Sequence, residues 1–171
     1  MADTHQKLRC PACQKEMEKV FIKKEGVNID ICLDGCGGMW FDNRELSYLD
    51  EQSENVDEIL TAITNKTFEQ VDESNHRSCP ACGARMVKNF SSAKKQIQID
   101  ECYACGGKFL DNQELVKFRG EYATESERSE DVVKMMYSTV GIELKKLSEQ
   151  REELANNRSL AKKLFDKMIY D

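Results

Sequence analysis

The feature that most constrains this chain is a repeated spacing of cysteine residues. All eight cysteines fall within two segments of equal length, and the second segment follows the first at an offset of 69 residues at both ends. Each segment holds two close pairs of cysteines, and the loop between the pairs is one residue longer in the second segment. No cysteine is left over. The two sets are Cys10, Cys13, Cys32 and Cys36, and Cys79, Cys82, Cys102 and Cys105.

This spacing is typical of a metal site. Two thiolates that are two to four residues apart on a tight turn can reach one ion, and a second such turn completes a tetrahedral shell of four sulfurs. Such a shell selects zinc or iron, and we predict zinc, with two ions per chain. Because four protein ligands fill the shell, no position stays open for water or substrate. We therefore predict structural sites in a protein that is not an enzyme.

Two other uses of the cysteines remain open. An iron site of the rubredoxin kind is consistent with the glycine that follows a cysteine at Gly37, Gly83 and Gly106. A thiol redox function is consistent with the Cys-Pro-Ala-Cys sequence that begins each segment, although a dithiol enzyme needs only one such pair. The N-terminal sequence MADTHQKLRC lacks the profile of a secretory signal, so we expect a cytoplasmic protein. In that compartment, paired cysteines indicate metal or redox chemistry rather than structural disulfides.

The sequence between the cysteine pairs predicts a β-hairpin in each segment. Val27, Ile29 and Ile31 alternate with polar residues in the first segment, and Ile97 and Ile99 do so in the second. Residues 17–24 and 86–91 are the expected partner strands. A hairpin this short is marginal alone, so the metal must supply much of the folding free energy, roughly 10 to 16 kcal/mol of apparent binding in small zinc modules.

Both segments end in the same way, with Gly-Gly, one further residue, an apolar pair that begins with an aromatic residue, and Asp-Asn-x-Glu-Leu. An aspartate followed three residues later by a glutamate predicts a capped helix that begins at Asp42 and again at Asp111. We interpret Trp40 and Phe109 as core residues beside the metal rather than as stacking platforms for bases.

Together these residues resemble the transcription-factor-IIB-type zinc ribbon found in small, often bacterial, proteins. Both copies match its pattern of ligands, glycines, aromatic residue and cap, and together they cover 74 of the 171 residues. The first copy departs from the pattern because Leu33-Asp34-Gly35 lies within its second cysteine pair. The family name describes a shape and does not by itself imply transcription. The resemblance implies zinc at Cys10, Cys13, Cys32 and Cys36, and at Cys79, Cys82, Cys102 and Cys105.

The sequence outside the ribbons predicts helices. Val56, Ile59, Leu60 and Ile63 recur at helical spacing, and an apolar stretch over 132–140 ends at Gly141. Beyond it, residues 142–170 contain neither glycine nor proline. There Leu147, Leu154, Ala161 and Met168 fall seven apart, flanked by Leu144, Leu160, Leu164 and Phe165. Such a stripe predicts a long amphipathic helix that either packs back on the ribbons or binds a second copy or another protein partner as a coiled coil.

We therefore predict a small α+β fold with two zinc-ribbon modules, each a hairpin with zinc knuckles followed by a helix, and a long C-terminal amphipathic helix. The expected domains are a zinc ribbon over 1–50, an acidic helical linker over 51–75, a second ribbon over 76–120 and a C-terminal helical region over 121–171.

Charge bears on the possible partners. The formal net charge is −6, and two zinc ions with four thiolates each bring it to about −10, which opposes binding to phosphate. No run approaches the roughly 18 apolar residues of a membrane span, so no membrane partner is expected.

The leading functional prediction is a non-enzymatic interaction module, followed by a nucleic-acid-binding ribbon protein and then by a redox-responsive cysteine protein. The basic residues that would contact nucleic acid are Lys7, Arg9, Lys15, Lys19, Lys23 and Lys24 in the first hairpin region, and Arg77, Arg85, Lys88, Lys94 and Lys95 in the second.

Overall fold

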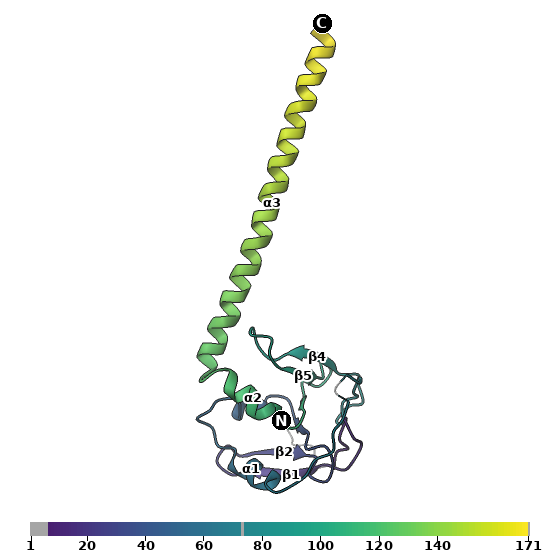
Figure 1. The fold of residues 1–171 in the computed structure, drawn as a ribbon, viewed down its shortest axis with the longest axis vertical. Coiled ribbons are helices and arrows are strands. Elements are labelled where there is room, and N and C mark those ends of the chain that lie inside the picture. Colours follow the sequence, from purple (N-terminus) through teal and green to yellow (C-terminus); the bar gives the residue numbers. More distant parts are fainter. Residues whose placement is uncertain (1–6, 73, 171) are drawn as a thin grey trace. The chain divides into compact units, whose positions relative to one another are not determined.

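The structure is a computed structural model that describes residues 7–72 and 74–170, with side chains over 7–72 and 74–157. The chain divides into two compact units, Met1–Ser129 and Glu130–Asp171. The first unit holds both cysteine-rich segments, and the second consists of helix (Figure 1). The predicted α+β class is confirmed.

The two cysteine-rich segments have the same order of strands. The first contains β1 (Glu18–Ile22), β2 (Val27–Ile31), β3 (Met39–Phe41), the 3₁₀ helix η1 (Glu45–Tyr48) and α1 (Asp57–Ile63). The second contains β4 (Val87–Phe90), β5 (Gln98–Glu101), β6 (Lys108–Leu110) and α2 (Glu114–Glu121). The long helix α3 (Glu125–Tyr170) completes the chain. Both predicted hairpins are present, and each gains a third strand.

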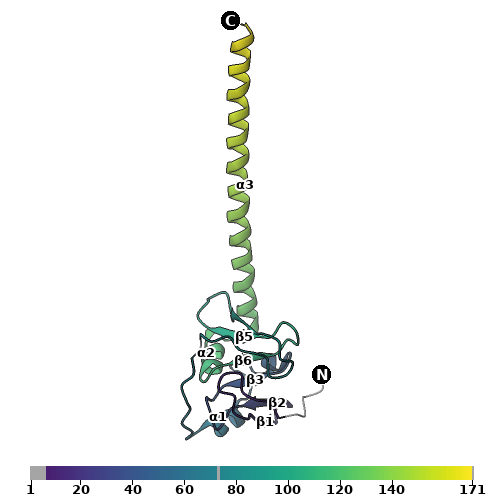
Figure 2. The same cartoon turned by 90° about the vertical axis from the view of Figure 1, so that its right-hand side faces the viewer.

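All six strands form one antiparallel sheet in the order β1-β2-β3-β6-β5-β4, most of which can be followed in Figure 2. The two halves of the sheet join through β3 and β6, where Trp40 pairs with Phe109 in register. The sequence did not predict this join, because a strand of three residues is too short to show a two-residue period. The two ribbons therefore share one continuous sheet.

The join requires glycine at two matching positions. A Cβ atom on Gly38 would lie 2.2 Å from Cζ of Phe109, and one on Gly107 would lie 2.1 Å from Cζ2 of Trp40. Both rings are fully buried, which confirms the prediction that they are core residues. The aromatic side chain of each ribbon thus lies against the glycine backbone of the other.

The helices after the third strands begin three residues later than predicted. η1 begins at Glu45 and α2 at Glu114, rather than at the preceding aspartates. One half of the expected capping arrangement is nevertheless present, since the backbone N–H of Asp42 donates to the Glu45 carboxylate at 2.7 Å. The equivalent bond from Asp111 to Glu114 is 2.6 Å long. The aspartate side chains instead bind groups in the core.

The remaining helices also differ from expectation. The linker helix is restricted to α1, which covers β1. The predicted stop at Gly141 is wrong, since α3 runs through it as one helix, and a glycine costs a helix only about 1 kcal/mol relative to alanine. Among the described residues, no helix is both long and apolar enough to cross a membrane. The side chains of Leu160, Ala161, Leu164, Phe165 and Met168, part of the predicted stripe, lie outside those that the structure describes.

Candidate metal centres

Each predicted set of four cysteines converges on one point. In both sets the four sulfur atoms lie within 4.8 Å of one another. Cys10 and Cys36 approach to 3.4 Å between their sulfurs, and Cys13 and Cys32 to 3.3 Å. The corresponding pairs in the second set are both 3.5 Å apart: Cys79 with Cys105, and Cys82 with Cys102. A tetrahedral ion with metal–sulfur bonds of about 2.3 Å needs sulfurs about 3.8 Å apart, so the donor set fits zinc.

The turns that present the sulfurs are the same in both sets. The amide of Cys10 donates to the Lys15 carbonyl at 2.8 Å, and the amide of Cys79 donates to the Ala84 carbonyl at 2.8 Å. The second turns are closed by Cys32 and Cys102, whose amides donate to the second glycine of the Gly-Gly pair at 2.9 Å. Because these bonds fix the backbone around each turn, both sulfurs of a pair point to the same side.

The electrostatics of the thiols favour a bound cation. Hydrogen bonds from the Cys10 and Cys32 thiols lower the pKa of Cys36 to about 4, whereas hydrogen bonds with the Cys32 and Cys36 thiols raise the pKa of Cys10. In the second set, burial opposes ionisation of Cys102, yet hydrogen bonds from the Cys105 amide and from neighbouring thiols lower its pKa to about 7. Each set therefore holds one thiol with a lowered pKa beside at least one thiol with a raised pKa: Cys10 in the first set, and Cys79 and Cys105 in the second. A divalent cation removes that conflict, since it stabilises all four thiolates together.

The two sites share one part of the core. Five of the eight cysteines pack in a cluster with Trp40 and Phe109, together with Leu8, Met17 and Met86. A second apolar cluster includes Ile59 of α1 and Phe118 of α2 together with residues of the strands. The metal sites thus lie beside the aromatic join of the two ribbons.

Comparison with known protein families agrees with this geometry. Residues 9–51 and 78–118 each match the family described as the transcription factor zinc finger, of the zinc-ribbon TFIIB type. Each segment is a zinc ribbon of this family. No curated protein and no solved structure matches the chain. The four-sulfur geometry and the family together support two zinc ions per chain, one in each ribbon.

Sequence reasoning missed a buried ionic network in the second ribbon. Arg77 was expected on a basic surface, but its side chain is 2% exposed and contacts Asp100 at 2.8 Å and Asp111 at 2.8 Å. Although burial opposes the charge, these carboxylates raise the pKa of Arg77. The guanidinium also lies 4.9 Å from the centroid of the Phe109 ring. The equivalent position in the first ribbon is the buried Leu8, and this alignment was the available signal that position 77 lies inside.

The two zinc sites differ in exposure. In the first ribbon three ligands are buried and Cys13 is half-buried, whereas in the second only Cys79 and Cys102 are buried, Cys105 is half-buried and Cys82 is exposed. The ligand sets are the same, so the difference arises from what surrounds them.

Proposed function

We propose that this protein is a non-enzymatic adaptor in which the joined zinc ribbons form a structural platform and α3 binds a protein partner, either a second copy of the chain or another protein. The observation that carries this proposal is a row of exposed apolar side chains on α3. Val133, Val140, Leu147 and Leu154 fall seven residues apart and are 48% to 64% exposed. Helices in water normally bury such a row, and an unpaired one marks an interaction surface.

The row extends the stripe predicted from the sequence toward the start of the helix. Tyr137 and Leu144 lie four residues after Val133 and Val140, and they are 76% and 62% exposed. Alternating steps of four and three residues give the 3.5-residue period of a coiled coil. Arg151 interrupts the row before Leu154. A charge at one core position of a coiled coil lowers stability while restricting which partner and register fit, which suits a specific partner.

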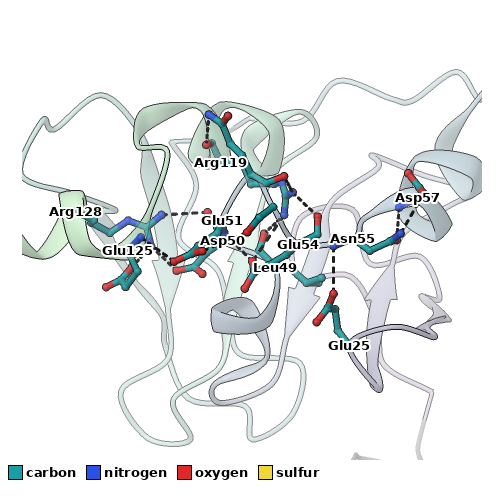
Figure 3. Close-up of polar contacts among 12 residues, drawn as sticks. Glu25, Leu49, Asp50, Glu51, Glu54, Asn55, Asp57, Arg119, Glu125 and Arg128 are labelled. Atoms are coloured by element: carbon teal, nitrogen blue, oxygen red, sulfur yellow. Dashed lines mark hydrogen bonds and ion pairs between the residues drawn. The ribbon is translucent and has the colours of Figure 1, made fainter.

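The start of α3 is held firmly on the platform (Figure 3). Arg128, in the second turn of α3, contacts the carboxylate of Asp50 and also Glu125 at 2.8 Å. The amide of Glu125 donates to the carboxylate of Glu51 at 3.0 Å. The Arg128 guanidinium lies over the ring of Phe118 in α2, 4.5 Å from its centroid. These contacts fix the first turns of the helix.

Arg119 strengthens the same region from α2. Its guanidinium donates to the carbonyls of Leu49 at 2.5 Å and Glu54 at 2.8 Å (Figure 3). The loop between η1 and α1 belongs to the first segment and Arg119 lies in α2 of the second, so this one side chain ties the two ribbons together. A platform held in this way is what an adaptor needs.

The absence of enzymatic activity is part of this proposal. Its support is the saturated ligand set: four sulfurs converge at each site, and a closed tetrahedral site leaves no position for a substrate.

Nucleic-acid binding has weaker support. Several of the basic residues in the hairpins are engaged in ion pairs: Lys15 with Glu69 at 2.5 Å, Lys19 with Asp30 at 3.0 Å, and Lys88 with Asp100 at 3.3 Å. Phosphate contacts would have to displace these carboxylates, and the overall charge of the chain is negative. We therefore rank this function below the adaptor role.

The adaptor proposal is tested with Leu147→Glu, which places a charge in the middle of the apolar row. The matched control is Lys145→Glu, two residues away, which introduces the same side chain on the opposite face of the helix. Native mass spectrometry of the zinc-loaded chain gives the oligomeric state and so tests whether α3 binds a second copy. If the partner is another protein, affinity capture identifies it, and the complex is then reconstituted from the purified partner and the purified chain. We expect Leu147→Glu to abolish the dimer or the reconstituted complex and Lys145→Glu to retain it. An equal effect of both variants, or of neither, contradicts the proposal.

A further inference from the structure

We propose that the two zinc sites differ in reactivity, and that the second is a peroxide-sensitive zinc-release site in which Cys82 is the first thiolate to react. This inference goes beyond the adaptor role and does not depend on it. It rests on what covers each site, on the exposure of the ligands and on the distance between two sulfurs.

The first site is covered by residues 66–69, which we call the covering segment. The ring of Phe68 packs on the knuckle so closely that a Cβ atom on Gly37 would lie 2.8 Å from its Cγ. The amide of Glu69 donates to the carbonyl of Gly35 at 2.9 Å. These contacts cover the second knuckle of the first site, where Cys32 and Cys36 are buried and where even the least buried ligand, Cys13, is only half-exposed.

The longer Cys-x3-Cys turn of the first ribbon contacts the covering segment. Asp34 lies in the longer Cys-x3-Cys turn, and its carboxylate binds Lys66 of the covering segment at 3.2 Å. Lys15, after the other knuckle, donates to the Asp34 carbonyl at 2.9 Å and to the Glu69 carboxylate at 2.5 Å. The departure from the family spacing thus coincides with the contacts that close the first site.

The second site is more exposed than the first at Cys82, although Asn43 packs on its second knuckle much as Phe68 packs on that of the first: a Cβ atom on Gly106 would lie 2.7 Å from Cγ of Asn43. Cys82 is exposed, and the next residue, Gly83, has no atom within 4 Å of the position where a Cβ would lie. The second knuckle is one residue shorter than that of the first ribbon, and the residues 69 positions after the covering segment belong to α3. Reactivity of a thiolate toward oxidants increases with its exposure, so Cys82 is the ligand that peroxide reaches first.

A second sulfur is placed to complete the reaction. The Cys82 thiolate attacks one oxygen of hydrogen peroxide, so that the O–O bond breaks, sulfenic acid forms and hydroxide leaves. The sulfur of Cys102, 3.5 Å away, then attacks the sulfenic sulfur, forms a disulfide and expels a second hydroxide. Two thiolates are oxidised by two electrons in total, one peroxide is reduced, and the zinc ion loses two of its four ligands. Release of that ion follows.

The test follows zinc release from the full, zinc-loaded chain during exposure to hydrogen peroxide, with a colorimetric zinc indicator. We expect two phases of one equivalent each, the first at least about tenfold faster, because opening the cover requires loss of a hydrogen bond and of apolar packing. Peptide mapping by mass spectrometry after the first phase should find the Cys82–Cys102 disulfide with the first site intact. Release of both ions in a single phase, or earlier oxidation of the first site, would overturn the proposal.

A pair of variants tests the cause of the difference. Phe68→Ala removes the ring of the covering segment, and Phe90→Ala removes a phenylalanine that is 49% exposed on β4. We expect Phe68→Ala to accelerate only the slow phase, and Phe90→Ala to change neither phase.

As a check that requires no variant, brief treatment of the wild-type chain with iodoacetamide should label Cys82 before any cysteine of the first site. Preferential labelling at Cys13 would contradict the assignment.

Discussion

The join between the ribbons makes a strong prediction, because two glycines there have no room for a methyl group. Gly107→Ala would place its Cβ 2.1 Å from Cζ2 and 2.4 Å from Cη2 of Trp40. Real Cβ atoms do not approach carbon this closely, so either the indole ring or the β3–β6 pairing must move. The ring is fully buried and its Nε1 donates to Asp42 at 2.9 Å, which leaves it little freedom.

Overpacking of a well-packed core costs about 1 to 3 kcal/mol, and the rigid ring places Gly107→Ala near the upper end of that range. For a unit of this size, about 4 °C of melting temperature corresponds to each kcal/mol, so we expect a decrease of about 8 to 12 °C. Differential scanning calorimetry with saturating zinc measures it. The control is Gly120→Ala, where no atom lies within 4 Å of the added Cβ, and there the helix should be unchanged or stabilised by up to about 1 kcal/mol.

A double-mutant cycle separates the clash from other effects of the substitution. In a Trp40→Leu background the indole atoms that meet the new methyl group are absent, so Gly107→Ala should cost less than about 1 kcal/mol there. The same large penalty in both backgrounds would refute the reasoning, because it would show that the glycine is needed for its backbone and not for the ring of the other ribbon.

Two further predictions concern the metal ligands and the buried ions. Cys82→Ser should lower the zinc content by one ion per chain, since one of four thiolates is lost, and native mass spectrometry that still finds two ions would contradict the four-sulfur assignment. Arg77→Met should cost about 3 to 5 kcal/mol, because it leaves the buried carboxylate of Asp111 without its cation and that of Asp100 with Lys88 alone. Lys88→Met, which removes a more exposed cation from Asp100, should cost less than about 1 kcal/mol in the same calorimetric assay. Equal losses of stability for Arg77→Met and Lys88→Met would show that burial does not determine how much each cation contributes to stability.

The sequence predicted those features of the structure that are formed by residues close together in the chain. The cysteine spacing predicted both four-sulfur clusters, because a knuckle is made by residues that adjoin in the chain. The hairpins followed from the alternation around Ile29 and Ile99 for the same reason. The β3–β6 join could not be predicted, since it depends on Gly38 of one copy and Phe109 of the other fitting together. Nothing in either copy alone reveals that fit.

The role of charged residues was also beyond local reasoning. Arg77 was counted with the basic hairpins, yet it is buried against carboxylates from two different segments. Asp111 was assigned to a helix cap, whereas its side chain binds Arg77 and only its amide takes part in the capping arrangement. In both cases a residue type fits two environments, and the chain segments that decide between them lie more than 20 residues apart.

Duplication has given this chain two sites with the same ligands and different surroundings, and the difference arises from small changes outside the ligands. The longer second knuckle and the linker that carries Phe68 cover the first site, while Cys82 and Gly83 leave the first knuckle of the other site exposed. The sheet is shared, and Arg119 connects the loop of one ribbon to the helix of the other. Loss of zinc from the open site would therefore loosen the aromatic join without first removing the other metal. Because α3 begins on that same platform through Arg128, a change at the second site has a direct physical route to the base of α3.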